Sequence, residues 1–69
     1  MALKTFTVLV RWKDGDVEDA DEIVVRSLSG IVAKRTASAV WKAMNSIKYP
    51  KAEIVEVEIL TSRMRRSFA

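Results

Sequence analysis

The densest group of reactive side chains is a run of six acidic residues at positions 14–22. Asp14, Asp16 and Glu18 have the one-three-five spacing of the oxygen ligands in an EF-hand calcium loop. Position six of such a loop requires glycine and position twelve requires glutamate, but the chain has Asp19 and Val25 there. The run therefore predicts a solvated hairpin tip whose charge discourages edge-to-edge strand pairing. We expect no bound metal and no other cofactor.

The residue types of the chain do not favour an enzyme active site. Histidine and cysteine, which most often carry acid-base and covalent catalysis, do not occur. Ser27, Ser29 and Lys34 could be combined into a serine-lysine pair, but their spacing suits helix capping and a solvated helix face better. We therefore expect a binding protein and not an enzyme.

Cations beside aromatic side chains could bind nucleic acid, because they neutralise phosphates and stack on bases. Arg11, Trp12 and Lys13 form one such group, although Trp12 also belongs to an inward-facing apolar row. A second group lies near the C-terminus and consists of Arg63, Arg65, Arg66 and Phe68. Residues 1–33 carry four bases and six acids, a charge of −2, whereas residues 34–69 carry eight bases and three acids, a charge of +5. Nucleic acid binding by the basic half and its tail is thus an alternative function.

These side chains depend on two N-terminal strands for their positions. Residues 4–13 alternate between apolar and polar types, which predicts a strand with its inner face formed by Phe6, Val8, Val10 and Trp12. Asp14-Gly15 favours a tight hairpin turn. We expect a loose acidic extension up to residue 22 and then a second strand at 23–28, with Ile23 and Val25 facing inward.

A helix and a third strand complete the pattern. Apolar residues at spacings of four and three predict a helix over 30–48 that ends before Tyr49-Pro50, with its inner stripe formed by Ala33, Ala37, Val40, Trp41, Met44 and Ile47. Residues 53–60 alternate again and predict a strand with Val55, Val57 and Ile59 facing inward. Residues 61–69 lack periodicity and are expected to form a mobile tail.

The order strand, strand, helix, strand predicts one α+β domain over residues 1–61, with a basic tail at 62–69. Its sheet would be antiparallel in the order 2-1-3, with the helix on one face. The early apolar run at 8–10 is too short for a signal peptide or a membrane span. We therefore expect a cytoplasmic protein that does not enter a membrane. A chain of 69 residues without a disulfide has a thin stability margin, so it needs either self-association or an unusually good core.

The sheet face opposite the helix predicts a protein contact. It would expose Leu9, Val24, Leu28, Ile54 and Leu60 among charged residues, and such patches on small proteins often bind partners. The strand at 53–60 would be an edge that could pair with a partner or a second copy. The candidate partner-binding residues are Leu9, Arg11, Lys13, Val24, Arg26, Ile54, Glu56, Glu58, Arg63, Arg65 and Arg66.

The layout resembles that of small bacteriophage host-takeover proteins, including a podovirus inhibitor of host RNA polymerase, and that of archaeal ribosomal proteins of similar size. The resemblance spans residues 4–60 and rests on the first strand, the alanine-rich helix with Trp41, and the return from Tyr49-Pro50 to Glu53-Ile54-Val55. It implies docking on a host protein. The podovirus inhibitor is acidic whereas this chain is basic, and no site residue is transferred from it.

Overall fold

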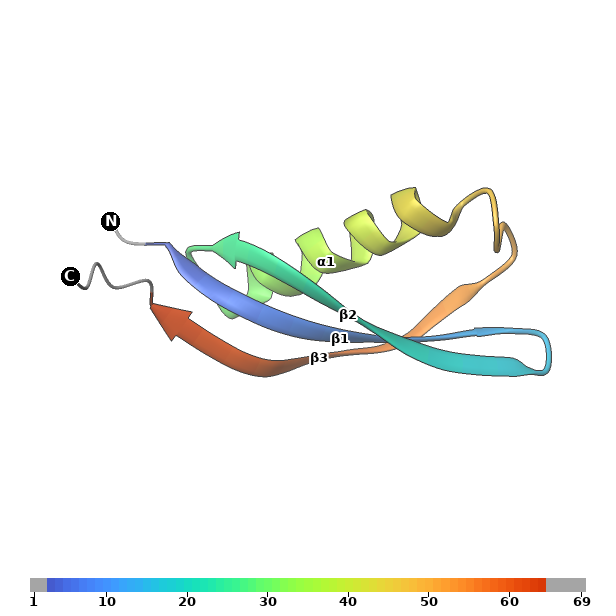
Figure 1. Ribbon diagram of the computed structural model, residues 1–69, viewed down its shortest axis with the longest axis horizontal. Coiled ribbons are helices and arrows are strands. Elements are labelled where there is room, and N and C mark those ends of the chain that lie inside the picture. Colours follow the sequence, from blue (N-terminus) through green and yellow to red (C-terminus); the bar gives the residue numbers. More distant parts are fainter. Residues whose placement is uncertain (1–2, 65–69) are drawn as a thin grey trace.

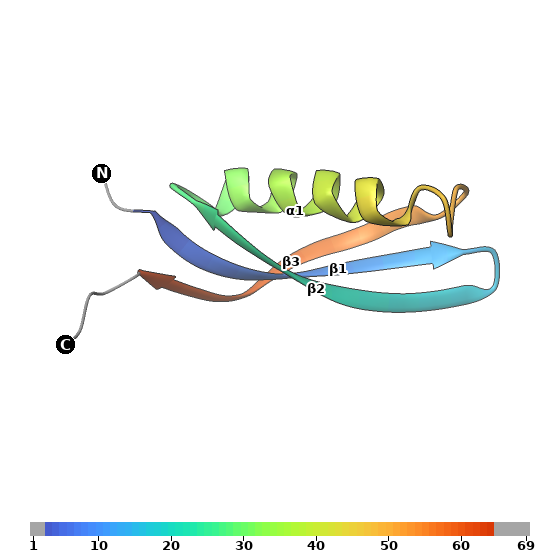
Figure 2. The same cartoon turned by 45° about the horizontal axis from the view of Figure 1, so that its top comes forward.

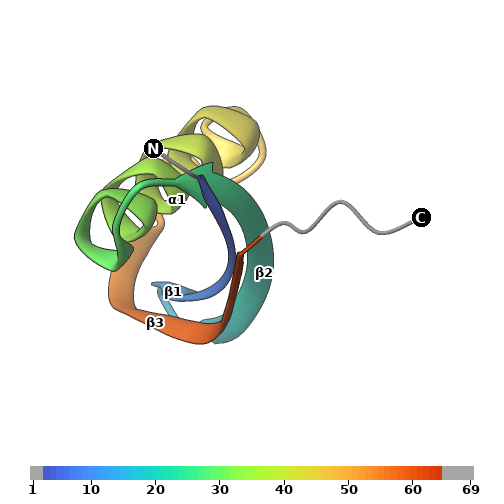
Figure 3. The same ribbon diagram turned by 90° about the vertical axis from the view of Figure 1, so that its left-hand side faces the viewer.

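Three antiparallel strands form a sheet, and one helix packs along one of its faces (Figures 1 and 2). The computed structural model describes residues 3–64. In chain order the elements are β1 (Lys4–Asp14), β2 (Val17–Ser27), α1 (Gly30–Asn45) and β3 (Glu53–Met64). The strand order is β2-β1-β3, so the expected α+β fold and its topology are confirmed. Seen along the long axis, the sheet curls toward the helix (Figure 3).

The β1-β2 hairpin is longer than the sequence pattern predicts. Asp14 pairs with Val17 across a two-residue turn, and pairing continues without interruption to Lys4 and Ser27. Gly15 has a φ of 60°, and no other described residue has a positive φ, as expected for a turn with glycine at its first central position. The loose extension up to residue 22 was a wrong prediction, because the tight turn brings the acidic arm directly beside β1.

Helix α1 begins at a serine cap. The Oγ of Ser29 accepts a hydrogen bond from the backbone N–H of Val32 at 3.3 Å, which satisfies one free donor of the first turn. The helix ends at Asn45, three residues earlier than expected, and its buried residues are Ala33, Ala37 and Trp41.

The inner stripe of the helix is narrower than predicted. Val40 is half-buried, but Met44 is 70% exposed and Ile47 is 95% exposed, so their assignment to the core was wrong. One helix on a curled three-stranded sheet covers only a narrow stripe, and Ile47 lies beyond the last helical residue.

Strand β3 contains two irregularities that break its alternation. Its register against β1 shifts between Arg11 and Trp12 and again between Thr7 and Val8, which leaves Val55 and Leu60 without a partner on β1. The first shift turns Ile54 toward the core and leaves Val55 60% exposed. The prediction for these two neighbours was therefore reversed, because a bulge inserts one extra residue and moves the following side chains to the other face.

Strand β3 also continues further than expected. Its pairing with β1 reaches Ser62, Arg63 and Met64, which were predicted to begin the tail. Residues 65–69 lie outside the described part of the chain.

The core is small and is centred on β1. The buried apolar residues are Phe6, Val8, Val10, Trp12, Val25, Ala33, Ala37 and Trp41. All four inner residues of β1 belong to it, which confirms the prediction that Trp12 is buried in the core. The partly buried Ile23, Ile54, Val57 and Ile59 pack around this cluster.

A polar contact joins β1, β2 and α1 within this apolar layer. The indole N–H groups of Trp12 and Trp41 both donate to Oδ2 of Asp21, at 2.9 Å and 2.7 Å. The Trp12 ring also lies 5.3 Å from that of Trp41 and 4.6 Å from that of Tyr49, between ring centroids. The half-buried Asp21 thus satisfies two buried donors that would otherwise cost free energy.

Candidate interaction surface

The face of the sheet turned away from α1 carries a basic centre between two acidic strands. Arg11 and Lys13 project from the central strand β1 and are exposed. The β1-β2 register puts Glu18 opposite Lys13 and Glu22 opposite Leu9. The β1-β3 register puts three more acids along the other side, namely Glu53, Glu56 and Glu58. We call this surface the outer sheet face.

One ion pair crosses this surface. Arg11 Nε lies 3.0 Å from Glu56 Oε1, and both side chains are about half exposed. Exposed pairs of this kind contribute only about 0–1 kcal/mol to stability, because water and salt screen them. The charged groups of the outer sheet face are thus held loosely enough to exchange partners with an incoming molecule.

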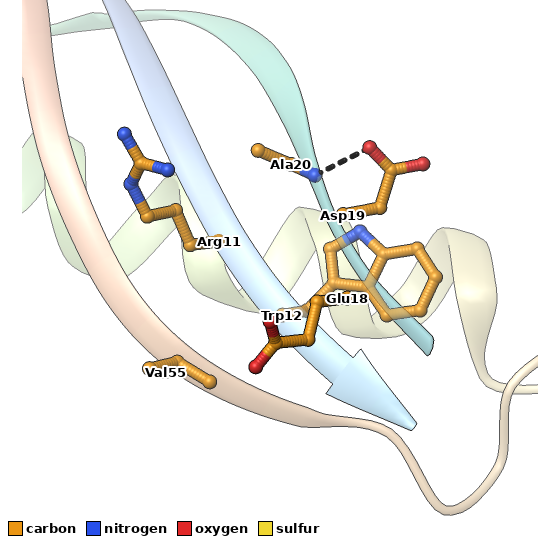
Figure 4. A pocket seen from close by; sticks show the side chains of 6 residues that line it. All are labelled: Arg11, Trp12, Glu18, Asp19, Ala20 and Val55. Carbon is orange, nitrogen blue, oxygen red and sulfur yellow. Dashed lines mark hydrogen bonds between the residues drawn. The ribbon is translucent and has the colours of Figure 1, made fainter. Parts of the chain in front are cut away.

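A shallow hollow of about 350 Å³ opens at the hairpin end of the same region. Figure 4 shows its lining side chains, which come from all three strands and are Arg11, Trp12, Glu18, Asp19, Ala20 and Val55. Asp19 Oδ1 accepts a hydrogen bond from the backbone N–H of Ala20 at 2.8 Å. The β3 bulge places the exposed Val55 side chain at this hollow, so apolar and charged groups lie side by side there.

The opposite side of the molecule has a different charge. Residues 27–52, which include α1 and the loop after it, contain five cations and no acid. These cations, all exposed, are Lys34, Arg35, Lys42, Lys48 and Lys51. We call this surface the helix face. A second hollow, of about 280 Å³, lies at the C-terminal end of α1, between Lys42 and Tyr49.

The structure brings most of the predicted binding residues onto one surface. Leu9, Arg11, Lys13, Glu56 and Glu58 lie together on the outer sheet face, in adjacent cross-strand rows. Val24 and Arg26 lie further along the same face, on β2.

The other four predicted binding residues have separate outcomes. Ile54 packs against the core and is removed from the candidate site. Arg63 lies on β3 opposite Thr5, in the cross-strand row that also contains Arg26. Arg65 and Arg66 lie outside the described residues, so their assignment stays a prediction.

Sequence reasoning missed Glu18, Glu22 and Val55 as members of this surface. The two glutamates could have been placed by extending the hairpin register back to the turn at Asp14-Gly15. Val55 could not, since only the bulge exposes it. The acid-free stretch at 27–52 can be read from the sequence, but the net charges of residues 1–33 and 34–69 do not reveal it because the stretch spans both halves.

Comparisons with family models, curated proteins and solved structures give no match. Within residues 3–64, no group of three or more acidic, histidine or cysteine side chains is placed to hold a metal ion. The helix of this part of the chain is too short and too polar to cross a membrane.

Proposed function

We propose that this protein is a non-enzymatic docking module that binds a protein partner through its outer sheet face. The observation that carries the proposal is the uncovered face itself, where exposed Val55 and half-buried Leu9 lie among Arg11, Lys13 and flanking glutamates. Protein interfaces of the non-obligate kind have this mixture of apolar and charged area, and complementary charge guides the encounter.

The proposal includes a cytoplasmic location and, following the phage-protein resemblance, a host protein as the partner. The lack of histidine and cysteine supports a role in binding over a role in catalysis. On the outer sheet face the cations Arg11 and Lys13 of β1 lie beside the acids Glu56 and Glu58 of β3. A partner surface with separate acidic and basic groups would complement both.

The test compares two faces of the same molecule. A partner captured by the wild-type chain from nuclease-treated host lysate should be lost by a double variant, Arg11→Glu with Val55→Asp. It should be retained by a matched helix-face variant, Lys34→Glu with Lys42→Glu. Titration of the purified partner should show at least a tenfold weaker Kd for the outer-face variant, about 1.4 kcal/mol. Loss of binding only in the helix-face variant would contradict the proposal.

A second candidate function is polyanion binding by the helix face. It is favoured by the five exposed cations of residues 27–52, which no acid of that segment offsets. Neutralised phosphates release counterions, so affinity for nucleic acid would fall steeply with salt.

The polyanion candidate is tested by the salt dependence of binding to a single-stranded oligonucleotide. Replacing Lys34, Arg35 and Lys42 by glutamine should reduce the slope of log affinity against log salt by about 2, since each phosphate contact contributes about 0.7 on single strands. An unchanged slope would exclude the helix face as the binding surface.

A further inference from the structure

Strand β2 has a free edge with a regular row of hydrogen-bonding groups. Within residues 3–64 it pairs with β1 on one side only, because the sheet order is β2-β1-β3. Asp14 and Val17 flank the two-residue turn and form a hydrogen-bonded pair, and such pairs alternate along an antiparallel ladder. Odd-numbered residues of β2 therefore direct their backbone N–H and C=O toward β1. Even-numbered residues direct theirs away from the sheet.

The two edges of the sheet differ in how well they could accept another strand. β3 carries bulges at Val55 and Leu60, and bulged edges oppose continued pairing. β2 runs from Val17 to Ser27 in unbroken register. Its first half is protected by acidic residues, whereas Ile23, Val24 and Val25 form an apolar stretch followed by Arg26. The edge suited to pairing is therefore the second half of β2, and not β3 as the sequence pattern indicated.

We propose that this protein forms a homodimer in which the β2 edges of two copies pair antiparallel about a two-fold axis at Val24. The even-numbered Val24 directs its backbone groups outward, so it can pair with its own copy across the axis. In this register Glu22 of each copy faces Arg26 of the other, which places two opposite-charge pairs beside a valine pair. The proposal is independent of the proposed docking function.

Centring the axis on a charged neighbour of Val24 is less favourable. Centring the axis on Glu22 would place the two Glu22 carboxylates opposite each other, and like charges directly opposed are destabilising. With the axis at Val24, Ile23 of one copy lies opposite Val25 of the other on the inner face. Val24, 65% exposed in the single chain, would gain a side-chain contact with Val24 of the other copy. Glu18 lies beyond the paired segment.

Charge exchange provides the first test, in sedimentation equilibrium. The wild-type chain should sediment at twice 7.8 kDa. Glu22→Arg and Arg26→Glu should each put like charges opposite one another and weaken dimerisation at least tenfold. The double variant Glu22→Arg/Arg26→Glu should restore the dimer. A mixture of the two single variants should form a heterodimer, because both of its pairs are again of opposite charge. Glu18→Arg is the matched control and should dimerise normally.

A disulfide test locates the axis. The chain has no cysteine, so Val24→Cys introduces a single thiol, and residues opposed in a hydrogen-bonded antiparallel pair have Cα atoms about 5.5 Å apart, within disulfide range. Val24→Cys should oxidise to a covalent dimer. Thr7→Cys, opposite Val24 on β1 and one strand from the edge, should not.

A wild-type chain that stays monomeric at millimolar concentration would overturn the proposal. So would a dimer that survives both single charge variants, since another surface would then hold it together. Failure of the charge exchange to restore a dimer, in chains with wild-type circular dichroism, would overturn the register.

Discussion

At the scale of single residues, Asp21 connects three elements of the fold through one carboxylate group. One carboxylate oxygen accepts hydrogen bonds from two tryptophans that are only 4% and 2% exposed. The tryptophans belong to β1 and α1, while Asp21 belongs to β2. This oxygen therefore joins the hairpin to the helix, and its loss would leave two indole donors unsatisfied inside the apolar layer.

Replacement of Asp21 by alanine should lower the free energy of unfolding by about 2–6 kcal/mol, because it leaves two buried donors without a partner and each costs about 1–3 kcal/mol. The measurement is urea unfolding followed by tryptophan fluorescence. Glu18→Ala, on the same strand but exposed, is the control and should change stability by about 0.5 kcal/mol or less. Equal stability of the two variants would show that the bridging oxygen has no structural role.

Residue types alone placed Trp12 correctly but did not reveal the role of Asp21. The apolar alternation of β1 is uninterrupted, so the inward row of Phe6, Val8, Val10 and Trp12 follows directly from it. Asp21 was one acid in a run of six, and nothing in its type distinguishes it from its neighbours. Its role depends on the position of Trp41, twenty residues away, which only the packing of helix on hairpin determines.

At the scale of elements, the bulges of β3 decide which side chains face the core. Strict alternation puts Val55, Val57 and Ile59 on one face, and Val57 and Ile59 do pack against the core. The register shift beside Trp12 exchanges Ile54 and Val55. A bulge has no fixed signature in a single sequence, since any residue can be the extra one. The alternation of β3 could therefore be predicted only over residues 56–59, between the two bulges.

Aspartate substitutions along β3 should show this exchange. Ile54→Asp should cost about 3 kcal/mol or more, because it removes a packed apolar side chain and brings a charge into the core. Val57→Asp should be similarly harmful. Val55→Asp should cost about 1 kcal/mol or less, since Val55 is exposed. Melting temperatures by circular dichroism provide the measurement, and a Val55 variant less stable than the Ile54 variant would place the bulge elsewhere.

The hairpin turn offers a second test at this scale. Gly15→Ala should lower the free energy of unfolding by about 1–2 kcal/mol, because a side chain disfavours the positive φ of this residue. The added Cβ would meet no atom within 4 Å, so the loss would be purely conformational. Asp16→Ala, at the adjacent turn position without positive φ, is the control. Chemical denaturation of both variants would check the difference.

At the scale of the whole molecule, the two layers carry different charge patterns. All charged residues of the helix face are basic, whereas the outer sheet face has acids on both flanking strands. The shortest dimension of the molecule is 18 Å, more than twice the Debye length of about 8 Å at physiological salt. The charges of one face are therefore largely screened from molecules at the other face.

The proposed dimer predicts that stability depends on protein concentration. A chain of 69 residues has a thin stability margin, and binding of folded chains to each other shifts the unfolding equilibrium by mass action. The melting temperature should rise by about 5 °C for each tenfold increase in concentration, given an unfolding enthalpy of about 0.7 kcal/mol per residue. Arg26→Glu should shift this dependence to at least tenfold higher protein concentration. A melting temperature independent of concentration in the wild-type chain would argue for a monomer.

The central position of β1 has a consequence for the order of folding. β1 comes first along the chain, yet the residues that pair with its second side follow 40 to 60 positions later. During synthesis the hairpin and helix can associate early, but one side of β1 stays open until β3 is made. Such distant contacts slow folding, so refolding followed by tryptophan fluorescence should take milliseconds to seconds. Until β3 has formed, the backbone groups on that side of β1 can hydrogen-bond only to water.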